Sequence, residues 1–202
     1  MVYDPEDFFT KRFKEFGMSL HSAGHRNKAN EKEYLDGANV IKENFGEHFL
    51  SAKQLDIGVG TGFYIQYFRE MGTLIYCGID ITDVLFNTIK KENPDVFLYK
   101  HDITDEPMEG PQTFNVITMI DVTQHIVNDD KFKQAMERVK GMLADDGIFI
   151  VTSHLKPDQM WTEYERFRPM EHYTELFEGY CFTIPAPFRD KWIFSIRKEQ
   201  DD

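Results

Sequence analysis

Three glycines at every second position follow an aspartate in the stretch Asp56-Ile57-Gly58-Val59-Gly60-Thr61-Gly62. Apolar residues before them predict a strand, and an apolar helical pattern after them predicts a helix. Such a turn brings bare main chain close to a ligand, because a side chain could block the approach or forbid the required φ angle. The dinucleotide pattern G-x-G-x-x-G would need a glycine where this chain has Phe63. The motif therefore predicts a ligand-binding loop and disfavours a dinucleotide.

Carboxylates follow the next predicted strands at the point where each strand ends. Asp80 ends the second strand, 22 residues after Gly58, and this distance suits a carboxylate that binds two ribose hydroxyls. Asp102 follows the third strand and Asp121 follows the fourth. Ligands of open α/β sheets bind outside the carboxyl ends of the strands. We therefore expect these side chains and the glycine loop to share one rim.

The pattern Asp-x-Gly-x-Gly-x-Gly, together with these strand ends, resembles the class I S-adenosylmethionine-dependent methyltransferases over residues 53–152. The resemblance implies S-adenosylmethionine as cofactor and S-adenosylhomocysteine as product. Carboxylates suit this ligand, because it has no phosphate and carries a sulfonium cation.

The resemblance also implies a role for each matching residue. The glycines would let main chain approach the methionine part of the cofactor, while Asp56 would support the loop and the cofactor amine. Asp80 would bind the ribose hydroxyls and Ile81 would pack on the adenine. Asp102 and the Ile103 N–H would recognise the adenine edge. Asp121 would lie near the methionine group or the transferred methyl.

Methyl transfer from a sulfonium requires mainly that donor and acceptor be held in contact, but a hydroxyl or acid acceptor must also lose a proton. His125, one helical turn after Asp121, is the first candidate for this base, and His154 is the second. A structural role for His125 is the alternative. Metal-dependent relatives need an Asp-Asn pair after the fifth strand, where this chain has Ser153-His154. We therefore expect no metal.

Substrate selection is expected from segments added to the core. Arginine pairs bidentately with carboxylate or phosphate. Arg166 and Arg168, with Arg26 and Tyr173, therefore suggest a small anionic metabolite as the methyl acceptor.

The elements that must position these residues alternate between strand and helix. Helices are predicted at 5–16, 31–45, 63–71, 82–92 and 131–143, the fourth capped by Thr82. Strands are predicted at 53–57, 73–79, 96–99, 114–120, 148–152, 181–184 and 191–197. A turn is expected at Asp145-Asp146-Gly147. This order predicts an α/β fold, a Rossmann-like open twisted sheet of seven strands, mostly parallel, with a C-terminal antiparallel hairpin and helices on both faces.

The 202 residues suit one domain. We expect an N-terminal helical lid at 1–50, a cofactor-binding core at 53–152, a substrate-side insertion at 153–180 and a terminal strand pair at 181–202. A formal charge of −12 argues against DNA as a partner. The two cysteines predict buried thiols in a reducing compartment, and no apolar run is long enough to cross a bilayer. We therefore expect a cytoplasmic protein.

Three alternatives remain from the sequence. One is a methyltransferase acting on protein or RNA. Another is a non-catalytic subunit that binds S-adenosylmethionine, and the third is an NAD-type oxidoreductase. The acceptor, the methylated element and the oligomeric state are left open.

Overall fold

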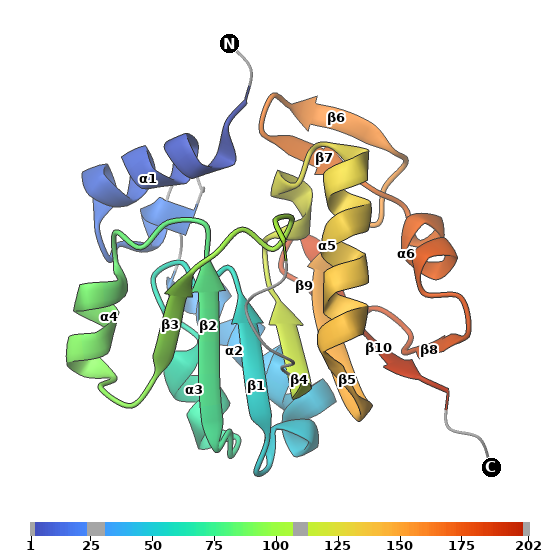
Figure 1. The fold of residues 1–202 in the computed structure, drawn as a ribbon, viewed down its shortest axis with the longest axis horizontal. Coiled ribbons are helices and arrows are strands. Elements are labelled where there is room, and N and C mark those ends of the chain that lie inside the picture. Colours follow the sequence, from blue (N-terminus) through green and yellow to red (C-terminus); the bar gives the residue numbers. More distant parts are fainter. Residues whose placement is uncertain (1–2, 24–30, 107–112, 200–202) are drawn as a thin grey trace. The chain divides into compact units, whose positions relative to one another are not determined.

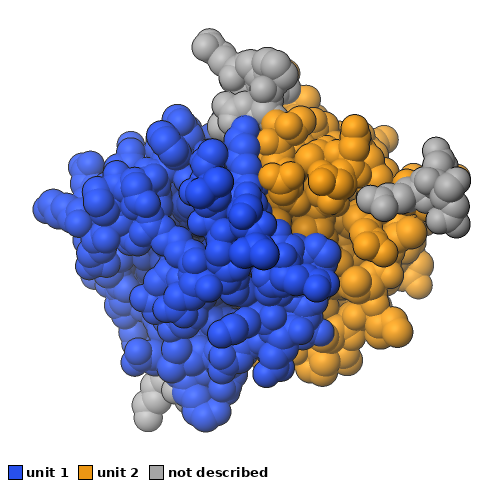
Figure 2. All heavy atoms as spheres, turned by 90° about the horizontal axis from the view of Figure 1, so that it is seen from below, with its two compact units in different colours: residues 1–102 blue, residues 103–202 orange. Residues whose placement is uncertain are grey.

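The computed structural model describes residues 3–23, 31–106 and 113–199. The chain divides into two compact units, residues 1–102 and 103–202, which Figure 2 colours separately. Eight strands belong to a Rossmann-like mixed sheet, mostly parallel, with antiparallel strands toward the C-terminus. The predicted fold class is therefore confirmed. The strand number of seven was wrong by one.

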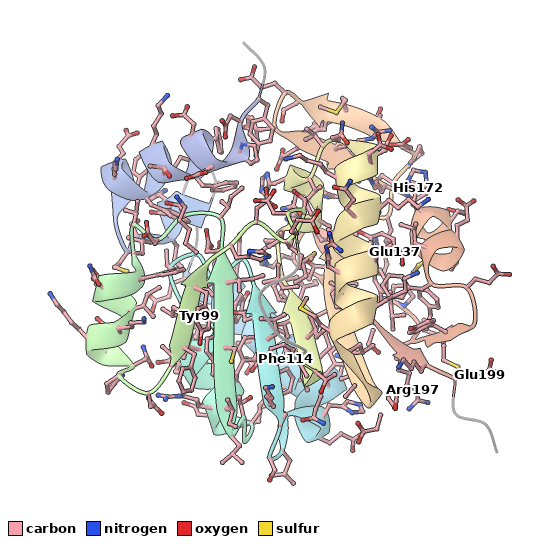
Figure 3. The ribbon with its side chains drawn as sticks, viewed as in Figure 1. Tyr99, Phe114, Glu137, His172, Arg197 and Glu199 are labelled. Atoms are coloured by element: carbon pink, nitrogen blue, oxygen red, sulfur yellow. The ribbon has the colours of Figure 1, made fainter. Side chains whose placement is uncertain are left out.

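Unit 1, residues 1–102, contains three parallel strands and the helices that precede and connect them. β2 pairs with β1 and with β3, and Tyr99 of β3, labelled in Figure 3, is exposed. The elements are α1 (Pro5–Phe16), η1 (Leu20–Ala23), α2 (Glu31–Phe45), η2 (Gly46–Phe49), β1 (Lys53–Ile57), α3 (Ile65–Glu70), β2 (Ile75–Asp80), α4 (Phe86–Glu92) and β3 (Phe97–Lys100).

Local sequence sets the ends of α1. The Asp4 side chain accepts a hydrogen bond from the Asp7 N–H at 3.1 Å, and Pro5 fits the first turn, where its missing N–H costs nothing. Gly17 ends the helix with φ 55°, a conformation that glycine adopts without strain. The predicted bounds of α1, α2 and β1 are confirmed.

Side-chain contacts join α1 to the carboxyl ends of β2 and β3. Thr10 Oγ1 donates to Thr82 Oγ1 at 2.9 Å, and Lys100 Nζ pairs with Glu6. In Figure 1, α1 lies across the ends of these two strands. These contacts therefore attach α1 to the end of β2 that carries Asp80.

Unit 2, residues 103–202, is built around β5. This strand pairs in parallel with β4 and antiparallel with β10, which also pairs with β8 and β9. Figure 1 shows α5 running along the strands of this unit. The elements are β4 (Phe114–Met119), η3 (Thr123–His125), α5 (Asp129–Met142), β5 (Leu143–Ser153), β6 (Gln159–Thr162), β7 (Glu165–Phe167), α6 (Met170–Leu176), β8 (Tyr180–Phe182), β9 (Ala186–Phe188) and β10 (Lys191–Lys198).

Three local predictions were wrong. The expected turn at 145–147 lies inside β5, as an irregularity between the pairs Phe114↔Leu143 and Val116↔Ile148. Thr82 does not cap α4, because this helix begins at Phe86 with Leu85 as its N-cap; the Thr82 side chain instead accepts a hydrogen bond from Thr10. The segment between the predicted strands 181–184 and 191–197 was given no strand, but it contains the eighth one, β9, which pairs with β10.

Candidate functional site

The glycine loop in unit 1 has the geometry that its sequence predicts. Gly58, Gly60 and Gly62 have φ angles of 82°, 56° and 74°, a region that other residues rarely adopt. The Gly58 and Val59 N–H groups donate to Ile79 O at 2.8 and 3.2 Å, which fixes the start of the loop on β2. Among the described residues, a Cβ added at Gly60 would meet no atom closer than Gly58 O at 3.9 Å, so these residues leave this part of the main chain accessible to a ligand.

Two other glycines serve packing around this loop. A Cβ at Gly62 would lie 3.0 Å from Ile65 Cδ1 and 3.3 Å from Ile89 Cγ1. A Cβ at Gly78, in the middle of β2, would clash with the Val59 side chain. The absence of a side chain at Gly78 therefore allows Val59 of the loop to pack against β2. The sequence interpretation missed it, although a glycine inside a predicted strand indicates close approach of another chain segment.

Asp80 binds the loop from the end of β2. Its Oδ2 accepts a hydrogen bond from the Gly60 N–H at 2.9 Å, and its Oδ1 accepts one from the Thr82 N–H at 3.1 Å. Burial raises the pKa of this carboxyl to about 6, although the bonds from Gly60 and Thr82 oppose the rise. A carboxylate has about four acceptor sites, so it can bind these N–H groups and still accept from ligand hydroxyls.

Asp56 is held from the neighbouring strand. Its Oδ2 accepts a hydrogen bond from the Tyr76 hydroxyl at 2.6 Å, and both side chains are buried. Burial and the Asp56 charge raise the pKa of Tyr76 well above its usual value. Tyr76, Gly78 and Asp80 alternate along β2 and therefore share one face of the strand, next to Asp56. The sequence interpretation did not include Tyr76.

The residues predicted to bind adenine follow β2 and β3. Ile81 is half-buried and directly follows Asp80, so part of an apolar side chain is accessible there. Asp102 is half-buried at the end of unit 1, and Ile103 is buried at the start of unit 2.

In unit 2, Asp121 follows β4 in an unusual conformation. Its φ is 61°, and its N–H donates to Thr152 Oγ1 at 2.8 Å. The carboxylate pairs with Arg189 and with Lys191 Nζ, the latter at 3.3 Å. Burial alone would raise the pKa of Asp121, but the charges of Lys191 and Arg189 outweigh it and hold the pKa well below its usual range.

His125 is hydrogen-bonded at both ring nitrogens. Nδ1 lies 3.0 Å from Tyr164 O, and because a carbonyl only accepts, Nδ1 is the donor. Nε2 then holds the lone pair and accepts from Gln124 Nε2 at 3.3 Å. The same amide nitrogen donates to Asp121 O at 3.0 Å. A proton could reach Nε2 only if the bond from Gln124 were lost, so this geometry favours a positioning role.

His154 directly follows β5 and is 7% exposed. Its ring contacts Phe167 at a centroid distance of 4.3 Å. Burial, with a smaller contribution from the Lys191 charge, lowers the pKa of His154 to about 4, so its ring is neutral at pH 7. Nδ1 is buried and has no hydrogen-bond partner among the described residues.

The arginines predicted to bind an anion are engaged within unit 2. Arg166 forms a bidentate pair with Asp158, with both distances 2.8 Å, and a further pair with Asp129 at 2.9 Å. Arg168 is 2% exposed, and its Nη2 donates to Ile126 O at 2.8 Å and to Asp129 at 3.1 Å. Their charges are thus balanced by aspartates of the same unit.

Tyr173 and Arg26 were also predicted to contact the substrate, and the structure describes only Tyr173. Tyr173 is fully buried in α6, and its ring packs against Phe132 and Phe194 at centroid distances of 5.5 and 5.2 Å. This position corrects the expectation of substrate contact, because Tyr173 belongs to the core of unit 2. Arg26 lies outside the described residues.

The sequence interpretation also missed Arg189 and Lys191. They lie 68 and 70 residues after Asp121 in the chain, so no local spacing relates them to it. Antiparallel pairing of Trp192 with Ser153 brings the start of β10 to the end of β5. The signal available in the sequence was a pair of basic residues before an apolar strand, which is common at strand ends.

Among the described residues, no group of three or more His, Cys, Asp or Glu side chains could hold a metal ion. Within the same ranges, no helix is both long enough and apolar enough to cross a membrane.

Comparison with known proteins gives a consistent result. A family model described as a methyltransferase domain matches residues 27–180. No curated protein sequence matches the chain.

Several solved structures share the fold. Bradyrhizobium japonicum N-methyltransferase NodS, in complex with S-adenosylhomocysteine, is 14% identical with a TM-score of 0.72, and the match covers 96% of this chain and 99% of that one. Burkholderia thailandensis 1,6-didemethyltoxoflavin-N1-methyltransferase, with bound 1,6-didemethyltoxoflavin and S-adenosylhomocysteine, is 16% identical with a TM-score of 0.71, covering 99% and 92%. A Clostridium acetobutylicum S-adenosylmethionine-dependent methyltransferase is 13% identical with a TM-score of 0.67, covering 95% and 99%.

Proposed function

We propose that this chain, which belongs to the methyltransferase domain family, transfers a methyl group from S-adenosylmethionine to a small-molecule acceptor. The observation that carries the proposal is the loop of three glycines with positive φ, which Asp80 holds through the Gly60 N–H. S-adenosylhomocysteine would be the second product.

The residues of unit 1 fit this cofactor. Main chain at Gly60 is open to a ligand, and the Asp80 carboxylate can accept from ribose hydroxyls. Gly58 and Gly62 would complete the loop against the methionine part, and Asp56 would support it. Bound there, the cofactor would supply an electrophilic methyl on a sulfonium.

We assign the adenine contacts to Ile81, Asp102 and the Ile103 N–H. Asp121 is assigned to the methionine end of the cofactor. Its carboxylate stays ionised because Arg189 and Lys191 pair with it.

The N-terminal segment is proposed to cover the cofactor. The bonds from Thr10 to Thr82 and from Lys100 to Glu6 attach α1 beside Asp80, within unit 1. Phe8 and Phe9 of α1 are partly buried, and their rings contact each other at a centroid distance of 5.1 Å. A lid of this kind would exclude water from the methyl group.

The acceptor is proposed to be a small molecule, in line with the similar 1,6-didemethyltoxoflavin-N1-methyltransferase, which holds bound 1,6-didemethyltoxoflavin. An anionic acceptor has weaker support than the sequence suggested, because Arg166 and Arg168 already pair with Asp129 and Asp158. His125 is proposed to position the residues near the methyl acceptor through its hydrogen bonds to Gln124 and to the Tyr164 carbonyl. We also propose a cytoplasmic location, since Cys77 and Cys181 are free thiols.

Isothermal titration tests the cofactor. S-adenosylhomocysteine should bind with micromolar affinity and NAD should show no heat of binding under the same conditions. Tight binding of NAD alone would overturn the proposal. An acceptor screen that follows S-adenosylhomocysteine release, with label counted separately in small molecules and in acid-precipitated protein and RNA, then tests the acceptor class.

A further inference from the structure

β3 is the outermost of the parallel strands in unit 1. It pairs with β2 on one side, and no strand of the described residues pairs with its other side. The His101 N–H donates to Asp80 O at 2.9 Å, and main-chain groups alternate in direction along a strand, so Phe97 and Tyr99 also bond toward β2. Leu98 therefore directs its N–H and C=O groups to the open edge, where they can bind a further strand.

Two aromatic side chains on one face of β3 are half exposed. Phe97 is 52% exposed and Tyr99 is 48% exposed, and residues two positions apart in a strand share a face. Phe97 pairs in register with Cys77, so Tyr76 lies on the opposite face, where it stacks with Phe68 of α3 at a centroid distance of 6.4 Å. In Figure 1, α3 accordingly lies behind β2. The open edge of β3 thus carries a pair of exposed rings on the face that α3 does not cover.

Antiparallel pairing with a second copy of the chain matches both features. If Leu98 lies on the two-fold axis, it exchanges both main-chain hydrogen bonds with Leu98 of the second copy. Phe97 then faces Tyr99 of the second copy, and two-fold symmetry repeats this pair on the other side of the axis. These are non-hydrogen-bonded positions, at which facing side chains are closest, and aromatic pairs there stabilise a sheet.

The charges at the two ends of β3 favour the antiparallel direction. Asp95 precedes the strand, whereas Lys100 and His101 lie at its end. The register centred on Leu98 places His101 opposite Asp95 of the second copy, with Lys100 next to it. Asp95 pairs with Arg69 but its side chain is 70% exposed, and the Lys100 side chain is 47% exposed, so both charges are accessible. A parallel arrangement would instead align like charges.

We propose that β3 pairs antiparallel with β3 of a second copy of this chain, with Leu98 on the two-fold axis, so that a homodimer forms across this edge. The proposal uses residues of unit 1 alone and does not depend on the proposed function. The paired edge is short, so we expect a weak dimer with a Kd of about 10–100 μM.

The first test is sedimentation equilibrium of the full chain, from micromolar to nearly millimolar concentration. Tyr99→Lys should raise the dimer Kd at least tenfold, because a charge would replace the ring that faces Phe97. Trp161→Lys places the same charge on an exposed aromatic residue of another short strand, at a side chain that is 62% exposed, and should leave the Kd unchanged. Both positions are exposed, so the Tm of each variant should stay within a few degrees. A monomer at every concentration, or an equal effect of the two variants, would overturn the proposal.

The second test determines the register. Phe97→Lys and Tyr99→Glu should each raise the Kd at least tenfold when alone. Mixed together they should form a heterodimer with a Kd within fivefold of the unsubstituted protein, because the introduced lysine faces the introduced glutamate and one aromatic pair remains.

A mixture of Phe97→Lys with Phe97→Glu is the matched control. It contains the same introduced charges, but in the proposed register they do not face each other, so association should not recover. Recovery in this control, or no recovery in the mixture of Phe97→Lys with Tyr99→Glu, would overturn the proposed pairing.

Discussion

Burial and hydrogen bonding act in opposite directions on Asp80, the carboxylate at the end of β2. Burial raises its pKa, and N–H donors from Gly60 and Thr82 oppose the rise, with a result of about 6. In an unfolded chain this group titrates near its usual value. The ionised form therefore costs stability in the ligand-free protein as the pH rises from about 4 to about 6, and stability from this group is greatest below that window.

The same titration should govern cofactor affinity, with the opposite dependence on pH. Ribose hydroxyls donate best to an ionised carboxylate, so S-adenosylhomocysteine should bind about 10-fold more weakly at pH 5 than at pH 7.5. Titration calorimetry across this range should show a midpoint near 6. Asp80→Asn should bind weakly at every pH, whereas Asp83→Asn, at an exposed position nearby, should behave like the unsubstituted protein. An unchanged pH profile in Asp80→Asn would contradict this assignment.

Substitutions at two glycines of the loop should affect different properties, cofactor binding at Gly60 and packing at Gly62. Gly60→Ala should cost about 1–3 kcal/mol of stability from φ strain and should weaken cofactor binding, because its surroundings are open. Gly62→Ala should be more destabilising, since its Cβ would also crowd Ile65 and Ile89. Gly141→Ala, in α5 with open space around it, should stabilise by about 0.5–1 kcal/mol. Urea unfolding measures the change in stability, and titration calorimetry with S-adenosylhomocysteine measures the change in cofactor affinity. If Gly60→Ala lost more stability than Gly62→Ala, the assignment of Gly60 to ligand binding and Gly62 to packing would be wrong.

Elements were predictable from sequence where local chemistry decides them. α1, α2 and β1 have capping residues, prolines or apolar periodicity that determine their ends, and their bounds agree with the prediction. The hairpin of β6 and β7 was missed, because its strands are only four and three residues long and are partly exposed, so they show no clear apolar pattern. The turn expected at 145–147 was wrong, since pairing with β4 keeps this segment in β5.

Arg168 directly follows β7 and joins this hairpin to η3 and to the start of α5. Arg168→Met should destabilise the protein by about 2 kcal/mol or more, because the carbonyls of Thr123 and Ile126 and the side chain of Asp129 lose a charged donor. Arg197→Met, at the exposed residue labelled in Figure 3, should change stability by less than about 0.5 kcal/mol. Urea unfolding of both variants tests this. Unchanged stability in Arg168→Met with a raised acceptor KM would restore the sequence-based role in substrate binding.

Across the whole molecule, predictability differed between the two units. In unit 1 the residues of the rim lie within 25 positions from Asp56 to Asp80, so spacing in the sequence reflects their position in space. In unit 2 the Asp121 cluster depends on β10 returning beside β5, a pairing that the sequence predicted only as a terminal strand pair. Arg189 and Lys191 could not be assigned to Asp121 without that register.

The net negative charge of the molecule should distinguish its ligands, the cofactor and nucleic acid. A ligand at 100 times its Kd stabilises the folded state by about 2.7 kcal/mol, which for a chain of this size raises the Tm by about 5–10 °C. S-adenosylhomocysteine at that excess should produce this shift. Transfer RNA at physiological salt should produce none, because a formal charge of −12 disfavours binding to a phosphate backbone. Thermal unfolding with Asp80→Asn as the reference separates cofactor binding from nonspecific effects. A comparable shift with transfer RNA would favour a nucleic-acid acceptor over a small molecule.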